Sequence, residues 1–139
     1  MEQALEYRLQ TLTVAEVARR AWGLLPWLDK FLSKGTGEMT AKEAIREALL
    51  EKLVLVLVWK GERIVAVLAF EVVVYPSMKA LRVVGMAGTE FSGWRQQATD
   101  YLILCAKALV ASRLEACGRK GLGRLCGAQE RARFFVREV

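Results

Sequence analysis

The stretch "LVLVLVWKGERIVAVLAFEVVVYPSMKALRVVGMA" (residues 53–87) decides the fold. It holds three runs rich in β-branched residues, at 53–59, 63–75 and 80–87, which the short turn signals KGE and PSMK separate. This pattern predicts three strands in an antiparallel meander. Because such a sheet must cover an apolar face with helices, and helical patterns flank it on both sides, the sequence predicts an α/β layer fold.

Two capping boxes mark helices before the sheet. Thr13 is followed three residues later by Glu16, and Thr40 is followed by Glu43. In each pair the hydroxyl accepts from an early helix N–H group and the carboxylate reaches back to the cap residue. We therefore predict one helix from about residue 14 and another that opens at Thr40 and runs through about residue 51.

Gly23 and Pro26 interrupt the first helical pattern. Proline lacks an N–H group and suits the first turn of a helix rather than its interior. We expect the helix to break there, with a second short helix from Pro26 to about Ser33.

A long helix is predicted after the sheet, from about Gly93 to Cys117, with Gly118 as its C-cap glycine. Its segment "YLILCAKALVA" (101–111) is apolar nearly all round, so we expect the helix to be buried. Apolar surface left uncovered there would support self-association or a protein partner. The terminal "FFVREV" (134–139) offers one last short strand.

Length and composition indicate a compact chain. At 139 residues with 54% apolar content, residues 1–139 are expected to form a single domain. The longest apolar run is too short to span a bilayer, so no membrane span is predicted. The N-terminus "MEQALEYRLQ" is acidic and polar, unlike a signal peptide, so we do not expect secretion by that route.

Missing residue types exclude several chemistries. The chain has no histidine, which removes Ser-His and Cys-His nucleophiles, an imidazole base and most transition-metal sites. Its three cysteines, Cys105, Cys117 and Cys126, form no CxxC pair and are odd in number. We expect no metal site and no disulfide framework, as in a reducing compartment.

The net charge of +6 is concentrated near the C-terminus. The segment "GRKGLGRL" (118–125) combines glycines with cations, so it could hold a phosphate, but we favour a structural turn with solvated surface cations. Nonspecific binding of nucleic acid through this end is a further possibility. The candidate residues for an anion or a partner are Arg119, Lys120, Arg124, Arg131 and Arg133.

Two features inside the chain are candidates for a site. "GTEFSGWR" (88–95) lies between a strand and a helix, where Gly88 and Gly93 have the spacing of a phosphate loop but lack its Lys-Ser/Thr. Glu71 lies in the apolar strand 63–75, where burial would raise its pKa and suit it to proton abstraction, while simple alternation would place it on an open sheet face. Tyr75 and Tyr101 could donate a proton or serve only in packing.

The order of elements resembles the GNAT (general-control-type N-acetyltransferase) superfamily. More narrowly, it resembles the small GNAT-like proteins of tailed bacteriophages, some of them internal virion proteins. The segment like Gly-Arg-x-Gly-Trp-x-Arg in those proteins falls here on Gly118, Arg119, Gly121, Leu122 and Arg124, with Leu122 in place of Trp. The stretches that carry the resemblance are "AWGLLPWLDKFL" (21–32), "TAKEAIREALLEKLVLVLVWKGERIVAVL" (40–68), "YPSMKALRVVGMAG" (75–88) and "GRKGLGRL".

The resemblance implies an acetyl-coenzyme A site that this chain lacks in part. Active members carry Arg/Gln-x-x-Gly-x-Gly/Ala between the central strand and the long helix, where N–H groups hold the coenzyme A pyrophosphate. Here that place holds "GTEFSGWRQQA" (88–98), and a near match, Gly118-x-x-Gly121-x-Gly123, comes only after the helix. The late tyrosine that often protonates the leaving thiolate is also missing, since no tyrosine follows Tyr101.

These departures favour a catalytically degenerate GNAT-like protein that acts as a phage virion-associated or interaction protein, in the host cytoplasm or the virion. On this reading no cofactor is needed, and acetyl-coenzyme A should bind weakly or not at all. One alternative is a divergent acetyl-coenzyme A-dependent N-acetyltransferase, with Glu71 or a water as base and Gly88 and Gly93 at the cofactor. A second alternative is a basic nucleic-acid-binding accessory protein.

Overall fold

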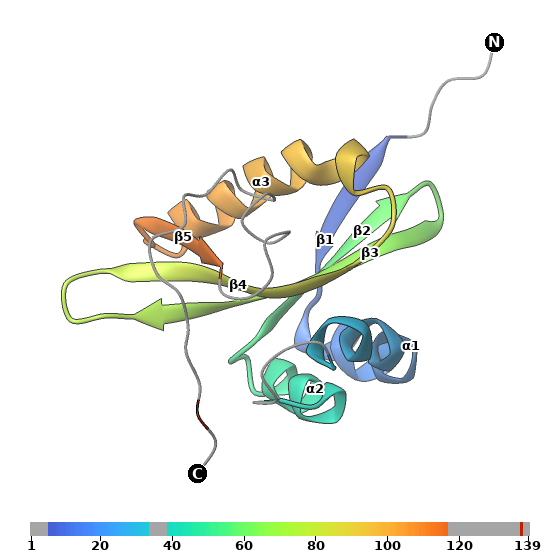
Figure 1. The fold of residues 1–139 in the computed structure, drawn as a ribbon, viewed down its shortest axis with the longest axis horizontal. Coiled ribbons are helices and arrows are strands. Elements are labelled where there is room, and N and C mark those ends of the chain that lie inside the picture. The colour runs from blue at the N-terminus through green and yellow to red at the C-terminus, as the bar shows by residue number, and fades with distance from the viewer. Residues whose placement is uncertain (1–5, 34–38, 117–136, 138–139) are drawn as a thin grey trace.

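The computed structural model describes residues 6–33, 39–116 and 137, which form a five-stranded sheet with helices on both faces (Figure 1). The helix α3 covers one face of the sheet, and α1 and α2 cover the other (Figure 1). The elements in chain order are β1 (Tyr7–Thr11), α1 (Val14–Leu32), α2 (Ala41–Leu49), β2 (Val54–Lys60), β3 (Arg63–Val74), β4 (Lys79–Gly88), α3 (Phe91–Ala108) and β5 (Arg113–Ala116).

The strands lie in the order β1-β2-β3-β4-β5. The first four pair antiparallel, and β5 pairs parallel to β4. The predicted meander is therefore confirmed in β2, β3 and β4. The meander gains a neighbouring strand on each side, β1 and β5, and neither was predicted from the sequence.

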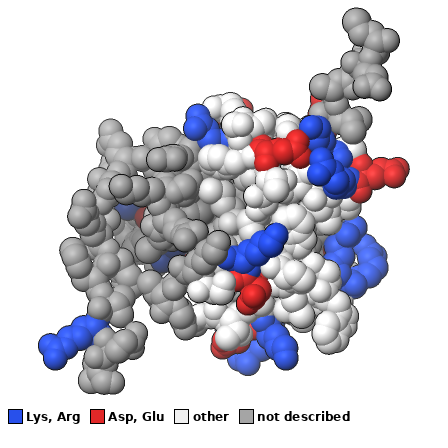
Figure 2. All heavy atoms as spheres, turned by 45° about the vertical axis from the view of Figure 1, so that its right-hand side comes forward, with Lys and Arg blue, Asp and Glu red and all other residues white. Residues whose placement is uncertain are grey.

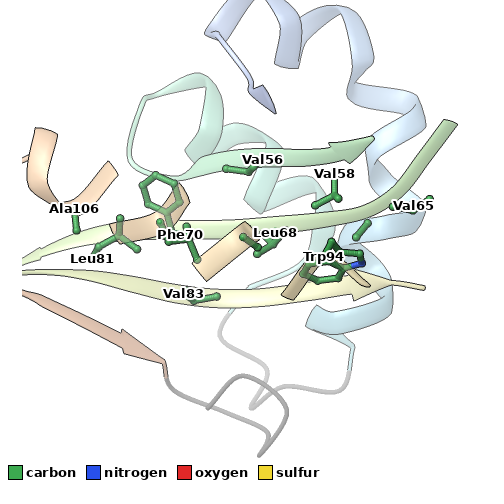
Figure 3. Close-up of a cluster of buried hydrophobic side chains, with 12 residues drawn as sticks. Val56, Val58, Val65, Leu68, Phe70, Leu81, Val83, Trp94 and Ala106 are labelled. Atoms are coloured by element: carbon green, nitrogen blue, oxygen red, sulfur yellow. The ribbon is translucent and has the colours of Figure 1, made fainter. Parts of the chain in front are cut away.

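Two clusters of buried side chains hold the layers together. One lies between the sheet and α3 and contains Val56, Phe70 and Trp94 (Figure 3). The other lies between the sheet and the helices α1 and α2 and contains Leu28 and Leu57. Successive residues of β2 alternate between the two clusters, which explains why its sequence is apolar without interruption.

Both capping boxes form as predicted. The N–H of Glu16 donates to Thr13 Oγ1 at 3.2 Å, and the N–H of Thr13 donates to Glu16 Oε1 at 3.0 Å. Thr40 and Glu43 repeat the arrangement with the same distances. The starts of α1 and α2 are thus fixed by local hydrogen bonds.

The predicted break at Gly23 and Pro26 is wrong, because α1 is one continuous helix with Pro26 inside it. Leu24 and Leu28 lie on either side of Pro26 along the helix and are both fully buried in the same cluster. Burying two such side chains stabilises the helix by about 3–6 kcal/mol, against a cost of about 3 kcal/mol for an interior proline. Gly23 and Pro26 both lie on the exposed side of the helix.

The predicted end of α3 at Cys117 is also wrong. The helix ends at Ala108, and Val110 turns the chain with a left-handed φ of 58°. The N–H of Ala111 donates to the carbonyl oxygen of Ala106 at 2.8 Å, which closes the helix end before β5 begins. A valine in this conformation is unusual, so the sequence carried no signal for the turn.

The helix α3 is not buried all round, contrary to the prediction. Leu104 is 65% exposed, and Ile103 is also exposed. One face alone packs on the sheet, and four of the five buried residues of α3 recur every four positions: Trp94, Ala98, Leu102 and Ala106, with Thr99 as the fifth. The apolar residues on the outer side are consistent with the predicted self-association, which stays a prediction.

Several sequence-based expectations lie outside the described residues. These are the phosphate or turn segment 118–125, the candidate cations Arg119, Lys120, Arg124, Arg131 and Arg133, and the strand expected at 134–139, of which only Arg137 is described. Gly118 does not cap α3, since that helix ends earlier. On the face shown in Figure 2, acidic and basic side chains of the described residues lie next to one another.

Within the described ranges, no helix has the length and apolar character needed to cross a membrane.

Two glycine substitutions test the packing of α1. A Cβ at Gly23 would meet no atom within 4 Å, so Gly23→Ala should stabilise the fold by about 0.5–1 kcal/mol through helix propensity.

A Cβ at Gly85 would lie 2.1 Å from the ring of Phe31, so Gly85→Ala should destabilise the fold by about 1–3 kcal/mol. Urea denaturation measures both changes, and a destabilising Gly23→Ala would contradict a continuous, solvent-facing helix at that position.

Candidate functional site

The strand β4 is paired along its whole length on one edge and, in the described residues, along only part of the other. On the first edge its pairing with β3 extends to Gly88. On the second edge, β5 pairs only with residues 80–83. In the part of the chain that the structure describes, no strand pairs with that edge over residues 84–88. Five residues of strand span about 17 Å, so a row of backbone N–H and C=O groups of that length has no strand partner among the described residues, and we call this row the open edge of β4.

A β-bulge marks the point where this open edge begins. Val83 pairs with Phe70 and Gly85 pairs with Ala69, so Val84 is an extra residue in β4. A bulge bends its strand and increases the local twist. Within the described residues, β5 ends at Ala116, which pairs with Val83, so the bulge lies directly after the last described pair of β4 and β5. We call β4 and β5 together the fork, and the stretch where they pair its closed end.

The open edge leads into a short loop, Gly88-Thr89-Glu90, that starts α3. Gly88 has a φ of 154°, and a Cβ there would lie 2.4 Å from the carbonyl oxygen of Val65, so the loop requires glycine. Glu90 precedes the helix in the left-handed conformation, with a φ of 59°, and its side chain caps no helix N–H group. Phe91 and Ser92 are the first helical residues, and their N–H groups have no partner within the helix.

Gly93 lies in the first turn of α3. A Cβ at this position would lie 2.5 Å from the hydroxyl oxygen of Tyr7, so the glycine allows the helix to pack closely on β1. The two predicted cofactor residues, Gly88 and Gly93, are therefore brought to the same loop and helix start. The packing explains both glycines, and their predicted role toward a cofactor stays a prediction.

The carboxylate of Glu90 points to the sheet instead of the helix. It accepts hydrogen bonds from Lys60 Nζ at 2.8 Å, from Tyr7 Oη at 3.1 Å and from Arg63 Nη2 at 3.1 Å. The hydrogen bond from Lys60 is the largest influence that lowers the pKa of Glu90, and the Tyr7 hydrogen bond and the charge of Arg63 add to it. We call Tyr7, Lys60, Arg63 and Glu90 the Glu90 clamp.

A second polar group lies at the closed end of the fork. Arg82 of β4 donates from Nη2 to Glu115 Oε1 of β5 at 3.0 Å and to Tyr75 Oη at 2.9 Å, and Tyr75 donates to Glu115 Oε1 at 2.7 Å. Arg113 pairs with the other oxygen of Glu115 at 3.3 Å. Glu71 lies 3.6 Å from Arg82 Nη1. We call these five residues the fork cluster.

Glu115 accepts hydrogen bonds from three side chains in this setting. Partial burial raises the pKa of Glu115, but hydrogen bonds from Tyr75, Arg82 and Arg113 outweigh that effect and hold the pKa below its usual value. A carboxylate stabilised in this way is a weak proton acceptor. We therefore infer that Glu115 organises the closed end of the fork and does not abstract protons.

Glu71 lies on the edge of the fork cluster, on the side of the sheet that α2 covers, in a shallow cavity with Glu47 and Glu51. Its side chain is 36% exposed, so the burial on which its predicted role as a base rested is not found. That role stays a prediction. Tyr101, the other tyrosine considered, hydrogen-bonds with Thr11 of β1 through its hydroxyl group.

Glu90, Arg82 and Glu115 are not among the site residues predicted from the sequence. Arg82 interrupts an apolar strand, which is a signal that it has a partner across the sheet. The partner, Glu115, could not be predicted, because the sequence pattern predicts a helix where β5 forms. Within the described residues, no group of three or more Cys, Asp or Glu side chains could hold a metal ion.

Comparison with solved structures identifies the architecture. A ribosomal-protein-alanine N-acetyltransferase from Brucella melitensis biovar Abortus 2308 superposes with a TM-score of 0.68 at 12% identity, covering 96% of this chain and 99% of its own. The glucosamine-6-phosphate N-acetyltransferase from Arabidopsis thaliana gives 0.64 at 14% identity, covering 95% and 97%. The chain has the GNAT fold. An aminoglycoside acetyltransferase, HMB0005, from an uncultured soil metagenomic sample gives 0.68 at 15% identity, covering 97% and 99%.

At these identities the similarity establishes the GNAT fold and not the activity. No protein-family model and no curated protein sequence matches the chain. The resemblance drawn from the sequence is confirmed at the level of the fold. The similar structures named above are acetyltransferases, and at these identities both the degenerate reading and the phage virion role of this chain stay predictions.

The low pKa of Glu115 predicts a contribution to acid stability. A carboxylate with a depressed pKa in the folded state stabilises the fold above its usual value of about 4.5, and this stabilisation is lost as the pH falls through the folded pKa. Glu115→Gln should lower the urea midpoint at pH 7 and reduce the difference between pH 7 and pH 3. Glu62→Gln, at an exposed turn, is the control. An unchanged pH dependence in Glu115→Gln would contradict the hydrogen bonding described.

Proposed function

We propose that this protein is an acyl-coenzyme A-dependent N-acyltransferase with acetyl-coenzyme A as its donor. The observation that carries the proposal is the open edge of β4, which ends at the uncapped N-terminus of α3 in a GNAT fold. This proposal reverses the sequence-based expectation of weak or absent binding. That expectation rested on a missing glycine motif, whereas the open backbone groups depend on strand pairing and helix position.

The backbone groups along the open edge of β4 and at the start of α3 fit two parts of coenzyme A. Its pantetheine arm carries amide groups, which can hydrogen-bond with the open backbone edge at residues 84–88 as an added strand would. Its pyrophosphate is an anion, which suits the N–H groups of Phe91 and Ser92 and the positive end of the α3 dipole. When bound, the cofactor supplies an activated acyl group. The chain supplies the groups that hold and orient it.

The closed end of the fork is the place where an acceptor amine would meet the acyl group. Glu115 and Glu71 give this end two carboxylates, of which Glu115 is fully paired and Glu71 has one long ion pair with Arg82. Glu71 is therefore the carboxylate better placed to accept a proton from an ammonium group, directly or through water. Arg82 and Tyr75 keep Glu115 and the two strands in register.

Other expectations stay predictions. A virion-associated or interaction role, self-association through the outer side of α3 and nonspecific nucleic-acid binding by the basic C-terminal residues have no described feature that favours them over acyl transfer. The exposed Leu104 and Ile103 are compatible with a partner and do not specify one.

Calorimetry with paired ligands tests the proposal. Acetyl-coenzyme A should bind with a dissociation constant in the micromolar range, about −8 kcal/mol. S-acetylpantetheine, which keeps the arm and lacks the pyrophosphate and nucleotide, should bind at least about tenfold more weakly, because the helix N-terminus then has no anion to hold. The absence of any heat with acetyl-coenzyme A at millimolar concentration would overturn the proposal. Equal binding of the two ligands would show that the N-terminus of α3 plays no part.

A further inference from the structure

Glu90 occupies a position where an acid would ordinarily interfere with an anion site. It is the N-cap residue of α3, one residue before the N–H groups of Phe91 and Ser92. Acidic side chains near a helix N-terminus are attracted to it and hydrogen-bond with its free N–H groups. A carboxylate in that position would occupy the donors and repel a phosphate group.

The structure keeps this carboxylate elsewhere, through donors from three different strands. Lys60 ends β2, Arg63 begins β3 and Tyr7 begins β1, and together they engage both oxygens of Glu90. The side chains of Lys60 and Glu90 are each only 29% exposed, so their ion pair is partly shielded from solvent. The ammonium of Lys60 also lies 5.5 Å from the centre of the Tyr7 ring, which steadies it further.

The backbone of Glu90 is consistent with a carboxylate held away from the helix. A left-handed conformation costs a non-glycine residue about 1–2 kcal/mol, and glycine would avoid that cost. An N-cap residue that bonds the helix normally adopts an extended conformation, as Thr13 and Thr40 do before α1 and α2. Among the three described helices, α3 alone starts without a side-chain cap.

We infer that Lys60 and Arg63 are positioning residues that hold the Glu90 carboxylate away from the N-terminus of α3 and so keep the N–H groups of Phe91 and Ser92 free for the cofactor phosphate. This role rests on the proposed function. The two cations act on the cofactor through Glu90, by removing a tethered competitor from the anion site. Lys60 and Arg63 lie at the hairpin between β2 and β3, so this hairpin influences the affinity for the cofactor.

A double-mutant cycle measured by calorimetry with acetyl-coenzyme A tests the inference. Lys60→Met keeps the aliphatic stem and removes the strongest donor to Glu90, so it should weaken binding about three- to fivefold. Glu90→Gln alone should change affinity by less than about twofold, and the double variant should return to the wild-type value. Lys79→Met, a charge-matched control at the opposite end of β4, should leave affinity unchanged.

Two outcomes of the cycle would overturn the inference. If Lys60→Met binds as tightly as wild type, Glu90 needs no restraint. If the double variant stays as weak as Lys60→Met, then Lys60 acts on the ligand or on the fold without Glu90. Thermal melts of each variant identify a loss of folding, which would appear as a lower Tm and not as a weaker dissociation constant alone.

Amide hydrogen exchange tests the clamp without any ligand, so the inference is separable from the proposed function. In Lys60→Met the released Glu90 carboxylate should bond to the helix N-terminus, and exchange at Ser92 should slow relative to wild type. Adding Glu90→Gln should remove that protection. Unchanged exchange at Ser92 in Lys60→Met would overturn the inference even if acetyl-coenzyme A binds. A wild-type protein that binds no acetyl-coenzyme A would instead overturn the proposed function.

Discussion

The extra residue in β4, Val84, is the constraint on which the site depends. Before it, β4 and β5 pair in parallel over four residues, and after it the described part of the sheet leaves one edge of β4 open. Packing on both faces holds β4 in place despite that open edge. Phe31 of α1 lies against Gly85 on one face, and Trp94 of α3 is buried against the other. The strand can therefore present free backbone groups without fraying, which an isolated edge strand could not do.

Local signals in the sequence predicted the parts of the fold that local chemistry determines. The capping boxes at Thr13 and Thr40 and the turns on either side of β3 were found because a few neighbouring residues specify them. The continuity of α1 was missed because burial of Leu24 and Leu28 outweighs Pro26, and burial is a tertiary property. The end of α3 was missed because Val110, a residue that disfavours the left-handed conformation, makes the turn.

The site was less accessible to sequence reasoning than the fold. Gly88 and Gly93 were identified from their spacing, and both do lie at the start of α3. The charged residues at the start of α3, such as Lys60 and Glu90, lie far apart in the sequence. No rule of residue spacing could have predicted that they form an ion pair. Glu71 was singled out as an acid in an apolar strand, but the more buried acid is Glu115, whose strand was not recognised. Motifs therefore pointed to the loop, and only the pairing of strands showed which backbone groups are free.

The most direct measurement of the central claim is the change in backbone amide NMR signals when acetyl-coenzyme A is added to the 15N-labelled protein. If the open edge of β4 and the start of α3 hold the cofactor, the largest shifts should fall on residues 84–88 and on Phe91 and Ser92, with small shifts in β1 and α2. Shifts confined to other elements, or no shifts at saturating ligand, would contradict the account.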